Sequence, residues 1–118
     1  MGQLSTHVLD TAHGCPAAGM QVSLQRVDDA GLATTLCQLK LDADGRAGGP
    51  LLSGAALCAG RYRLRFEVAA YFRSRGLVLP EPPFIDIVQL DFGVAQAEAN
   101  YHVPLLVSPW AYSTYRGS

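Results

Sequence analysis

The sequence predicts an all-β protein, an antiparallel sandwich or barrel of about seven short strands with one short helix. Apolar and polar residues alternate with a period of two along most of the chain. Clusters of turn-forming residues such as "AHGCPAAG", "DADG" and "LPEPP" separate the alternating runs. A single segment, "AAYFRSRG", breaks the alternation. Together these observations favour packed β-sheets over helices.

The first three strands are predicted in the N-terminal third of the chain. "STHVLD" (residues 5–10), "MQVSLQRV" (20–27) and "LCQLKL" (36–41) each alternate between two faces. In the second run, Met20, Val22 and Leu24 share one face, which predicts a half-buried strand.

The clearest alternation is "RYRLRFEV" at residues 61–68, where four apolar side chains face one way and three arginines and a glutamate face the other. We interpret the charged row as the solvated face of a sheet, with a binding patch as the weaker alternative. "AAYFRSRG" (69–76) follows directly. Its ending in Gly76 is typical of a short helix with a glycine stop.

The last strands are predicted at "IVQLDFGV" (87–94), "NYHVPLLV" (100–107) and "WAYSTYR" (110–116). In the middle run Tyr101, Val103 and Leu105 form the apolar row. Pro104 indicates an edge strand or a bulge, because proline has no N–H to donate to a ladder.

Length and composition predict one domain over residues 1–118 and exclude several functions. A net charge of −1 gives no basic field for nucleic acid. No apolar run approaches the ~20 residues of a membrane span, and the N-terminus lacks a signal-peptide core. The three cysteines show no CxxC spacing, so we expect reduced thiols, two of them buried, and a cytoplasmic location.

Only three histidines are present, and two of them lie on predicted strands. His7 shares its face with Ser5 and Leu9, and His102 lies opposite the apolar row of its strand. Strands hold side chains more firmly than loops do, so both are candidate catalytic groups, although a lone histidine is more often structural than catalytic. His13, in a Gly-Pro turn, is predicted to be a solvated loop residue.

Arg46 follows the "DADG" turn, where a surface charge is the ordinary interpretation. A three-histidine zinc site is a weak alternative, because the close paired spacing of such sites is missing. The sequence has no nucleophile elbow, P-loop or dinucleotide-binding fingerprint. An enzyme built on these residues would therefore use histidines and an arginine to activate water.

Four segments together resemble the transthyretin-related family of 5-hydroxyisourate hydrolases: "LSTHVLDTAHGCPAAGM", "DADGR", "GRYRLRF" and "YHVPLLVSPWAYSTYRGS". The resemblance runs nearly end to end. The terminal "YRGS" is its most specific part, because transthyretin lacks that tetrapeptide and the two histidines. The proline-rich stretch "LVLPEPPFIDIVQLDF" departs from the family pattern, which puts the conformation of the loop at 80–83 in doubt.

The resemblance implies a transthyretin-like Greek-key sandwich of seven to eight strands, assembled as a homotetramer (a dimer of dimers) with active sites in clefts between subunits. It implies hydrolysis of 5-hydroxyisourate to 2-oxo-4-hydroxy-4-carboxy-5-ureidoimidazoline in urate degradation, with no metal or other cofactor. It maps the catalytic residues onto His7, Arg46, His102 and Ser118, and the substrate-binding residues onto His7, Arg46, Tyr115, Arg116 and Gly117.

Within that scheme we expect one histidine to take a proton from water and the other to orient the water or protonate the leaving nitrogen. His102 supported by Ser118 is the favoured base, although the two histidines could exchange roles. Arg46 would hold carbonyl oxygens and disfavour protonation of a nearby imidazole. Arg116 has an equal claim to a structural role.

Two other functions compete with the hydrolase. The first is a transthyretin-like carrier of a small hydrophobic ligand, which needs no histidines in a cleft. The second is a structural or interaction module without catalysis. The occurrence of His7, Arg46, His102 and "YRGS" in one chain favours the hydrolase over both.

Overall fold

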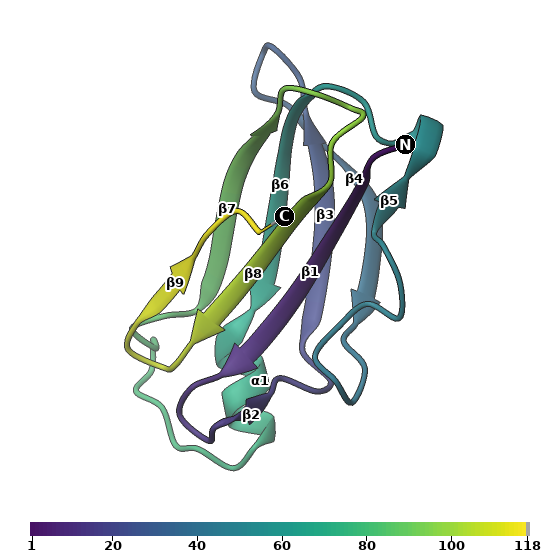
Figure 1. The fold of residues 1–118 in the computed structure, drawn as a ribbon. Coiled ribbons are helices and arrows are strands. Elements are labelled where there is room, and N and C mark those ends of the chain that lie inside the picture. The colour runs from purple at the N-terminus through teal and green to yellow at the C-terminus, as the bar shows by residue number, and fades with distance from the viewer. Residues whose placement is uncertain (118) are drawn as a thin grey trace.

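A computed structural model describes residues 1–117 as two β-sheets packed face to face, with a helix at one end (Figure 1). The architecture is therefore a sandwich, which settles the choice between sandwich and barrel. Ser118, one of the expected catalytic residues, lies outside the described residues.

The first sheet has the order β2-β1-β8-β9, with β5 also paired to β1. Its strands are β1 (Gln3–Asp10), β2 (Cys15–Pro16), β5 (Leu52–Ser53), β8 (Tyr101–Val107) and β9 (Tyr112–Thr114). β1 and β8 run parallel, whereas the other strand pairs are antiparallel. Because these two strands come from opposite ends of the chain, no tight hairpin has to join them.

The second sheet has the order β4-β3-β6-β7. Its strands are β4 (Ala33–Lys40), β3 (Gln21–Val27), β6 (Gly60–Glu67) and β7 (Ile87–Val94). The alternation predicted for residues 61–68 is confirmed, because Tyr62, Leu64 and Phe66 are fully buried and their neighbours on β6 are not. These rings and side chains meet the inward rows of the first sheet, such as Leu4 and Val8, in one core.

The predicted helix is α1 (Val68–Ser74), and Gly76 just beyond it adopts a φ of 89°. Only glycine takes this left-handed conformation without strain, so the glycine stop is confirmed. A single 3₁₀ turn, η1 (Gly54–Ala56), was not predicted. Neither helix within residues 1–117 has the length and apolar character that crossing a bilayer requires.

The edge position or bulge expected at Pro104 is wrong. β8 lies between β1 and β9, and the pairs Leu105–Thr114 and His102–Gly117 keep one register. In this register Pro104 lies opposite Tyr115, which is outside β9, so the missing N–H falls where the ladder is already interrupted. Thr114 Oγ1 donates instead to the Pro104 carbonyl oxygen at 2.7 Å. The proline thus interrupts the pairing of β8 with the C-terminal segment without shifting it.

All three cysteines are unpaired thiols in the described chain. The expectation that two are buried is wrong, since Cys15 and Cys37 are partly exposed and Cys58 is exposed. Cys37 faces inward from β4, but β4 is the edge strand of its sheet and is only partly covered.

Candidate active site

The outer face of the first sheet brings His7 and His102 onto adjacent strands. In the parallel pairing of β1 with β8, Ser5 lies beside His102 and His7 lies beside Pro104. On its other side His7 forms an isolated bridge with Arg46. Residues 7, 46 and 102, which are far apart in the sequence, therefore occupy one stretch of sheet surface. This surface is the candidate active site.

The turn at 42–46 positions Arg46 against β1. The Asp42 carboxylate accepts the backbone N–H groups of Asp44 and Arg46 at 2.9 and 3.0 Å, which closes the turn. Gly45 passes so close to β1 that an added Cβ would lie 2.5 Å from the Val8 carbonyl oxygen. Val8 N–H in turn donates to the Gly45 carbonyl at 2.9 Å. The "DADG" sequence thus closes the turn and lets it hydrogen-bond to β1, the strand that carries His7.

His7 is held by this loop as a hydrogen-bond donor. Its Nε2 lies 2.9 Å from the Asp44 carbonyl oxygen, and a carbonyl oxygen can only accept. Nε2 therefore carries a proton. The carboxylate of the same Asp44 accepts from Arg46 Nε at 2.8 Å. Asp44 thus orients both groups, although it is itself exposed.

His102 is partly buried, and its Nδ1 lies 2.8 Å from Ser5 Oγ. Burial, followed by the positive charge of Arg46 and the charge of His7 when protonated, lowers the pKa of His102 below its ordinary value. The imidazole is therefore largely neutral at pH 7, as a general base must be. Within residues 1–117 its Nε2 has no hydrogen-bond partner.

The C-terminal segment packs directly on His102. Gly117 N–H donates to the His102 carbonyl oxygen at 2.7 Å, and His102 N–H donates to the Gly117 carbonyl oxygen at 3.4 Å. A Cβ added to Gly117 would lie 2.9 Å from Cδ2 of the imidazole and 3.0 Å from its Cβ. A glycine is therefore required for this close approach.

Tyr115 and Arg116 are not brought to the two histidines within one chain. The Arg116 guanidinium lies 4.2 Å from the Tyr101 ring centroid and donates to the Asn100 carbonyl oxygen at 3.1 Å. This geometry supports the structural role considered for Arg116. Tyr115 is 61% exposed. Tyr115 and Arg116, together with Phe92, line a hollow of about 450 Å³ between β7 and the C-terminal segment.

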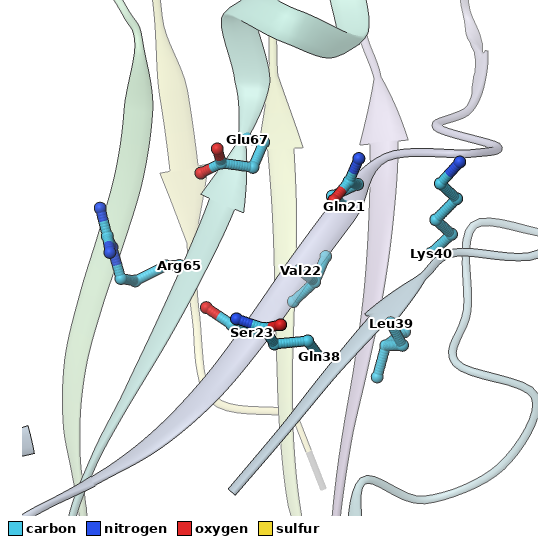
Figure 2. Close-up of a pocket in the computed structure, with 8 residues that line it drawn as sticks. All are labelled: Gln21, Val22, Ser23, Gln38, Leu39, Lys40, Arg65 and Glu67. Atoms are coloured by element: carbon cyan, nitrogen blue, oxygen red, sulfur yellow. The ribbon is translucent and has the colours of Figure 1, made fainter. Parts of the chain in front are cut away.

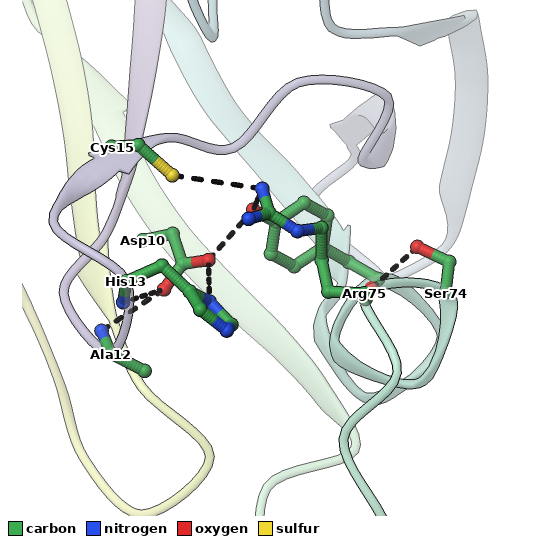
Figure 3. A network of polar contacts seen from close by, with 7 residues as sticks. Asp10, Ala12, His13, Cys15, Ser74 and Arg75 are labelled. Carbon is green, nitrogen blue, oxygen red and sulfur yellow. Dashed lines mark hydrogen bonds and ion pairs between the residues drawn. The ribbon is translucent and has the colours of Figure 1, made fainter.

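The expectation that His13 is a solvated loop residue is confirmed as to its place, since it is exposed in the turn after β1, but its side chain also has a buried partner. Its Nδ1 lies 2.6 Å from the buried carboxylate of Asp10, which also accepts from Tyr71 (Figure 3). His13 therefore belongs to a buried hydrogen-bond network around Asp10, at the C-terminal end of β1. The side chains of His7 and His102 lie on the other face of the sheet.

A second hollow, of about 400 Å³, lies on the outer face of the second sheet (Figure 2). It is lined by polar side chains that include Ser23, Gln38 and Arg65. The Arg65 Nε is buried without a partner among the described residues. The hollow contains no histidine or thiol, so it offers no group that titrates near neutrality. We do not assign catalysis to it.

Ser5 and Asp44 are site residues that the sequence alone did not single out. Ser5 shares the face of His7 on its strand, and Asp44 belongs to the quoted "DADG" turn, but neither pattern reveals its partner. Both contacts depend on strand register, which becomes visible only in the folded chain. Within residues 1–117, no three His, Cys, Asp or Glu side chains gather as a set of metal ligands.

Comparison with known proteins gives one consistent result. Residues 4–117 match the model of the HIUase/Transthyretin family. The protein named 5-hydroxyisourate hydrolase of Ralstonia nicotianae is 52% identical over 118 residues, which is 100% of both chains.

Solved structures agree with the sequence comparison. (S)-allantoin synthase superposes with a TM-score of 0.93 at 44% identity, over 99% of this chain and 44% of that one, so this chain spans less than half of that protein. Sea bream transthyretin in complex with thyroxine superposes with a TM-score of 0.85 at 27% identity, covering 98% of this chain and 94% of its own.

Proposed function

The chain belongs to the HIUase/transthyretin family, and we propose that it hydrolyses 5-hydroxyisourate at the surface formed by His7, Arg46 and His102. The product is 2-oxo-4-hydroxy-4-carboxy-5-ureidoimidazoline, and the reaction belongs to urate degradation. The observation that carries the assignment is the neutral, half-buried His102, placed near Arg46 and His7 in a chain similar to a hydrolase along its whole length.

The reaction opens a cyclic acyl–nitrogen bond with water. His102 Nε2 takes a proton from the water as its oxygen bonds to the acyl carbon. The carbon–nitrogen bond then breaks, its electron pair stays on the nitrogen, and the proton held by His102 is returned to that nitrogen. A positioned base of this kind contributes roughly 10²- to 10⁴-fold to the rate.

Arg46 and His7 complete the site as donors. The Arg46 guanidinium stabilises the negative charge that develops on the acyl oxygen, an effect typically worth about 10²- to 10³-fold for one donor. His7 already donates through Nε2 to Asp44, so it is poorly placed to act as a base through that atom. This contact favours His102 as the base and leaves His7 to orient the substrate.

The remaining residues of the "YRGS" segment are assigned by family resemblance. Tyr115 and Gly117 would bind substrate, Ser118 would support His102, and Arg116 would bind substrate only if it left Tyr101. We infer a homotetramer in which neighbouring subunits complete the cleft over the first sheet. Exposed rings near the sheet edge support this inference, since Phe84 is 73% and Trp110 59% exposed in the single chain and the two rings lie 6.0 Å apart.

The decisive experiment is a stopped-flow assay in which urate oxidase supplies fresh 5-hydroxyisourate. Purified protein should accelerate the decay of substrate absorbance in proportion to its concentration, above the spontaneous rate. Size-exclusion chromatography with light scattering on the same sample should give four copies. A decay equal to that of the buffer control would reject the hydrolase and leave the carrier or the structural module.

The carrier alternative needs an apolar binding surface. The outer face of the first sheet holds His7, His102 and Arg46 instead, which favours chemistry over the storage of a hydrophobic ligand. We also propose that residues 1–118 act as one hydrolase domain and that the protein is cytoplasmic. The three unpaired thiols support a reducing compartment. The cytoplasmic location is tested by titrating the thiols of this protein in freshly lysed cells and comparing them with an air-oxidised sample.

A further inference from the structure

The contact between Ser5 and His102 determines which nitrogen of the catalytic imidazole carries the proton. Ser5 Oγ lies 2.8 Å from His102 Nδ1, and the two residues are direct neighbours in the β1/β8 register. Both side chains are partly buried on the same face of the sheet. The contact is therefore set by the backbone pairing of two strands and does not depend on a loop.

A neutral imidazole has two tautomers, and each gives this contact a different direction. If the Ser5 hydroxyl donates to Nδ1, the proton of His102 lies on Nε2, and Nε2 cannot accept one from water. If Nδ1–H donates to Ser5 Oγ, the lone pair of Nε2 is free. Nε2 is also the ring nitrogen without a partner in residues 1–117, so only the second direction leaves a usable base there.

Gly117 restrains the same ring from the other side. Its backbone lies so close to His102 that a Cβ would come within 2.9 Å of the imidazole Cδ2. The ring is thus confined between a hydroxyl and a peptide backbone, and a flip about its Cβ–Cγ bond, which would put Cδ2 in the place of Nδ1, would break the Ser5 contact. Of the charged groups around His102, Arg46 and His7 lower its affinity for protons, whereas Arg116 is turned away to Tyr101.

We propose that Ser5 is a positioning residue: its Oγ accepts the Nδ1–H of His102 and so holds the imidazole in the tautomer whose Nε2 is unprotonated. This inference rests on the proposed function, because it presumes that His102 acts as the base. A hydroxyl suits the task because it orients the ring without adding negative charge, so the imidazole stays neutral. A carboxylate in the same place would favour imidazolium.

The first test is spectroscopic and does not depend on turnover. Nitrogen-15 NMR of histidine-labelled protein at pH 8 distinguishes the two tautomers. The wild-type signal of His102, assigned with His102→Gln, should show Nδ1 protonated. In Ser5→Ala it should move to the Nε2-protonated form that a free histidine side chain prefers. A wild-type His102 protonated on Nε2 would overturn the proposal, whatever the activity.

The second test is kinetic. Ser5→Ala should lower kcat roughly 10- to 100-fold with little change in KM, a fraction of what a positioned base contributes. Ser5→Thr keeps the hydroxyl and should stay within about threefold of wild type. Ser5→Asp should move the acid limb of the pH–rate profile upward, because a carboxylate favours the imidazolium form.

The matched control is Ser23→Ala, which removes a serine hydroxyl from the outer face of the other sheet and should leave kcat and the pH profile unchanged. Circular dichroism and thermal melting of every variant separate loss of fold from loss of positioning. A folded Ser5→Ala with wild-type kcat would contradict the proposal. If wild-type protein shows the Nδ1–H tautomer but no turnover, the proposed function fails while the hydrogen-bond assignment stands.

Discussion

The imidazoles of His102 and His13 each contact a side chain of β1 through Nδ1, but their partners differ in charge. His102 meets the neutral hydroxyl of Ser5 at 2.8 Å, whereas His13 meets the carboxylate of Asp10 at 2.6 Å. Asp10 is fully buried and His13 retains 28% of its side-chain exposure. A neutral partner leaves the imidazole free for the proposed proton transfer, whereas a buried carboxylate partner holds it in a structural network.

The Asp10 network joins the hairpin after β1 to helix α1 (Figure 3). One carboxylate oxygen accepts the backbone N–H groups of Ala12 and His13, and the other accepts from His13 Nδ1 and from the Tyr71 hydroxyl at 2.8 Å. Burial raises the pKa of Asp10, but the hydrogen bonds from Tyr71 and His13 outweigh it and lower the pKa below its ordinary value. The pKa of Tyr71 is raised by burial and by Asp10. The carboxylate therefore acts as an ionised structural anchor.

Exchanging each histidine for glutamine should separate the two roles most sharply. His102→Gln should lower kcat roughly 10²- to 10⁴-fold with an unchanged melting temperature, because it removes the proposed base from a partly exposed position. His13→Gln should lower stability and keep the turnover of the folded fraction. Stopped-flow rates and thermal melting, measured on the same samples, check both. Equal activity losses in the two variants would mean that the comparison is wrong.

Arg46→Ala should have the next largest effect, about 10²- to 10³-fold on kcat. It should also move the acid limb of the pH–rate profile. Because Arg46 lowers the pKa of His102, its removal lets that pKa rise toward about 6.5. The variant should therefore lose activity at a higher pH than wild type as the medium is acidified.

The control for Arg46 is Arg63→Ala on the second sheet. Arg63 donates to Asp91 at 2.6 and 3.2 Å on an exposed face, where such an ion pair contributes little to stability. The Arg63→Ala substitution should leave both kcat and the pH–rate profile unchanged. A wild-type rate for Arg46→Ala would remove Arg46 from the site.

Asp10→Asn should test the structural half of the comparison. Loss of the buried charge that His13 and Tyr71 contact should lower the free energy of unfolding by about 3 kcal/mol at pH 7, measured by urea titration. The lowered pKa of Asp10 gives stability above its unfolded pKa of about 3.9, and this is lost as the pH falls through the folded pKa below it.

The variant should therefore be less stable than wild type at neutral pH and converge with it below pH ~3.9. Asp91→Asn, at an exposed carboxylate, is the matched control and should change stability by less than ~1 kcal/mol. A constant difference between Asp10→Asn and wild type across the acid range would exclude ionised Asp10 as the cause.

Tyr71→Phe should have the smallest effect, about 1 to 1.5 kcal/mol, because it removes one hydrogen bond to Asp10 and leaves the ring packed against Phe72. Tyr112→Phe, at an exposed ring, should change stability by less than ~0.5 kcal/mol. Urea midpoints of the two variants measure the contrast. If Tyr71→Phe matched Tyr112→Phe, the hydroxyl would have no part in anchoring Asp10.

Alternation and turn residues predicted much of the fold. The buried row of β6, the helix that ends before Gly76 and the opposite faces of His7 and Val8 all follow from the periods of local structure. The prediction at Pro104 was wrong for a physical reason. A proline is harmless in a central strand when its missing N–H faces a gap in the ladder, and local sequence does not show where that gap lies.

The chain by itself determined which side chains face the core and which remain on a surface, because strand alternation is a local property of the backbone. It also limited the groups available for chemistry to a few histidines and arginines. The partners of these groups follow from how distant segments come together in the folded chain. The parallel pairing of β1 with β8 sets Ser5 beside His102, and the turn at 42–46 sets Asp44 beside His7 and Arg46. The Ser5–His102 and His7–Asp44 pairings depend on long-range register, and a shift of one residue would separate both of them.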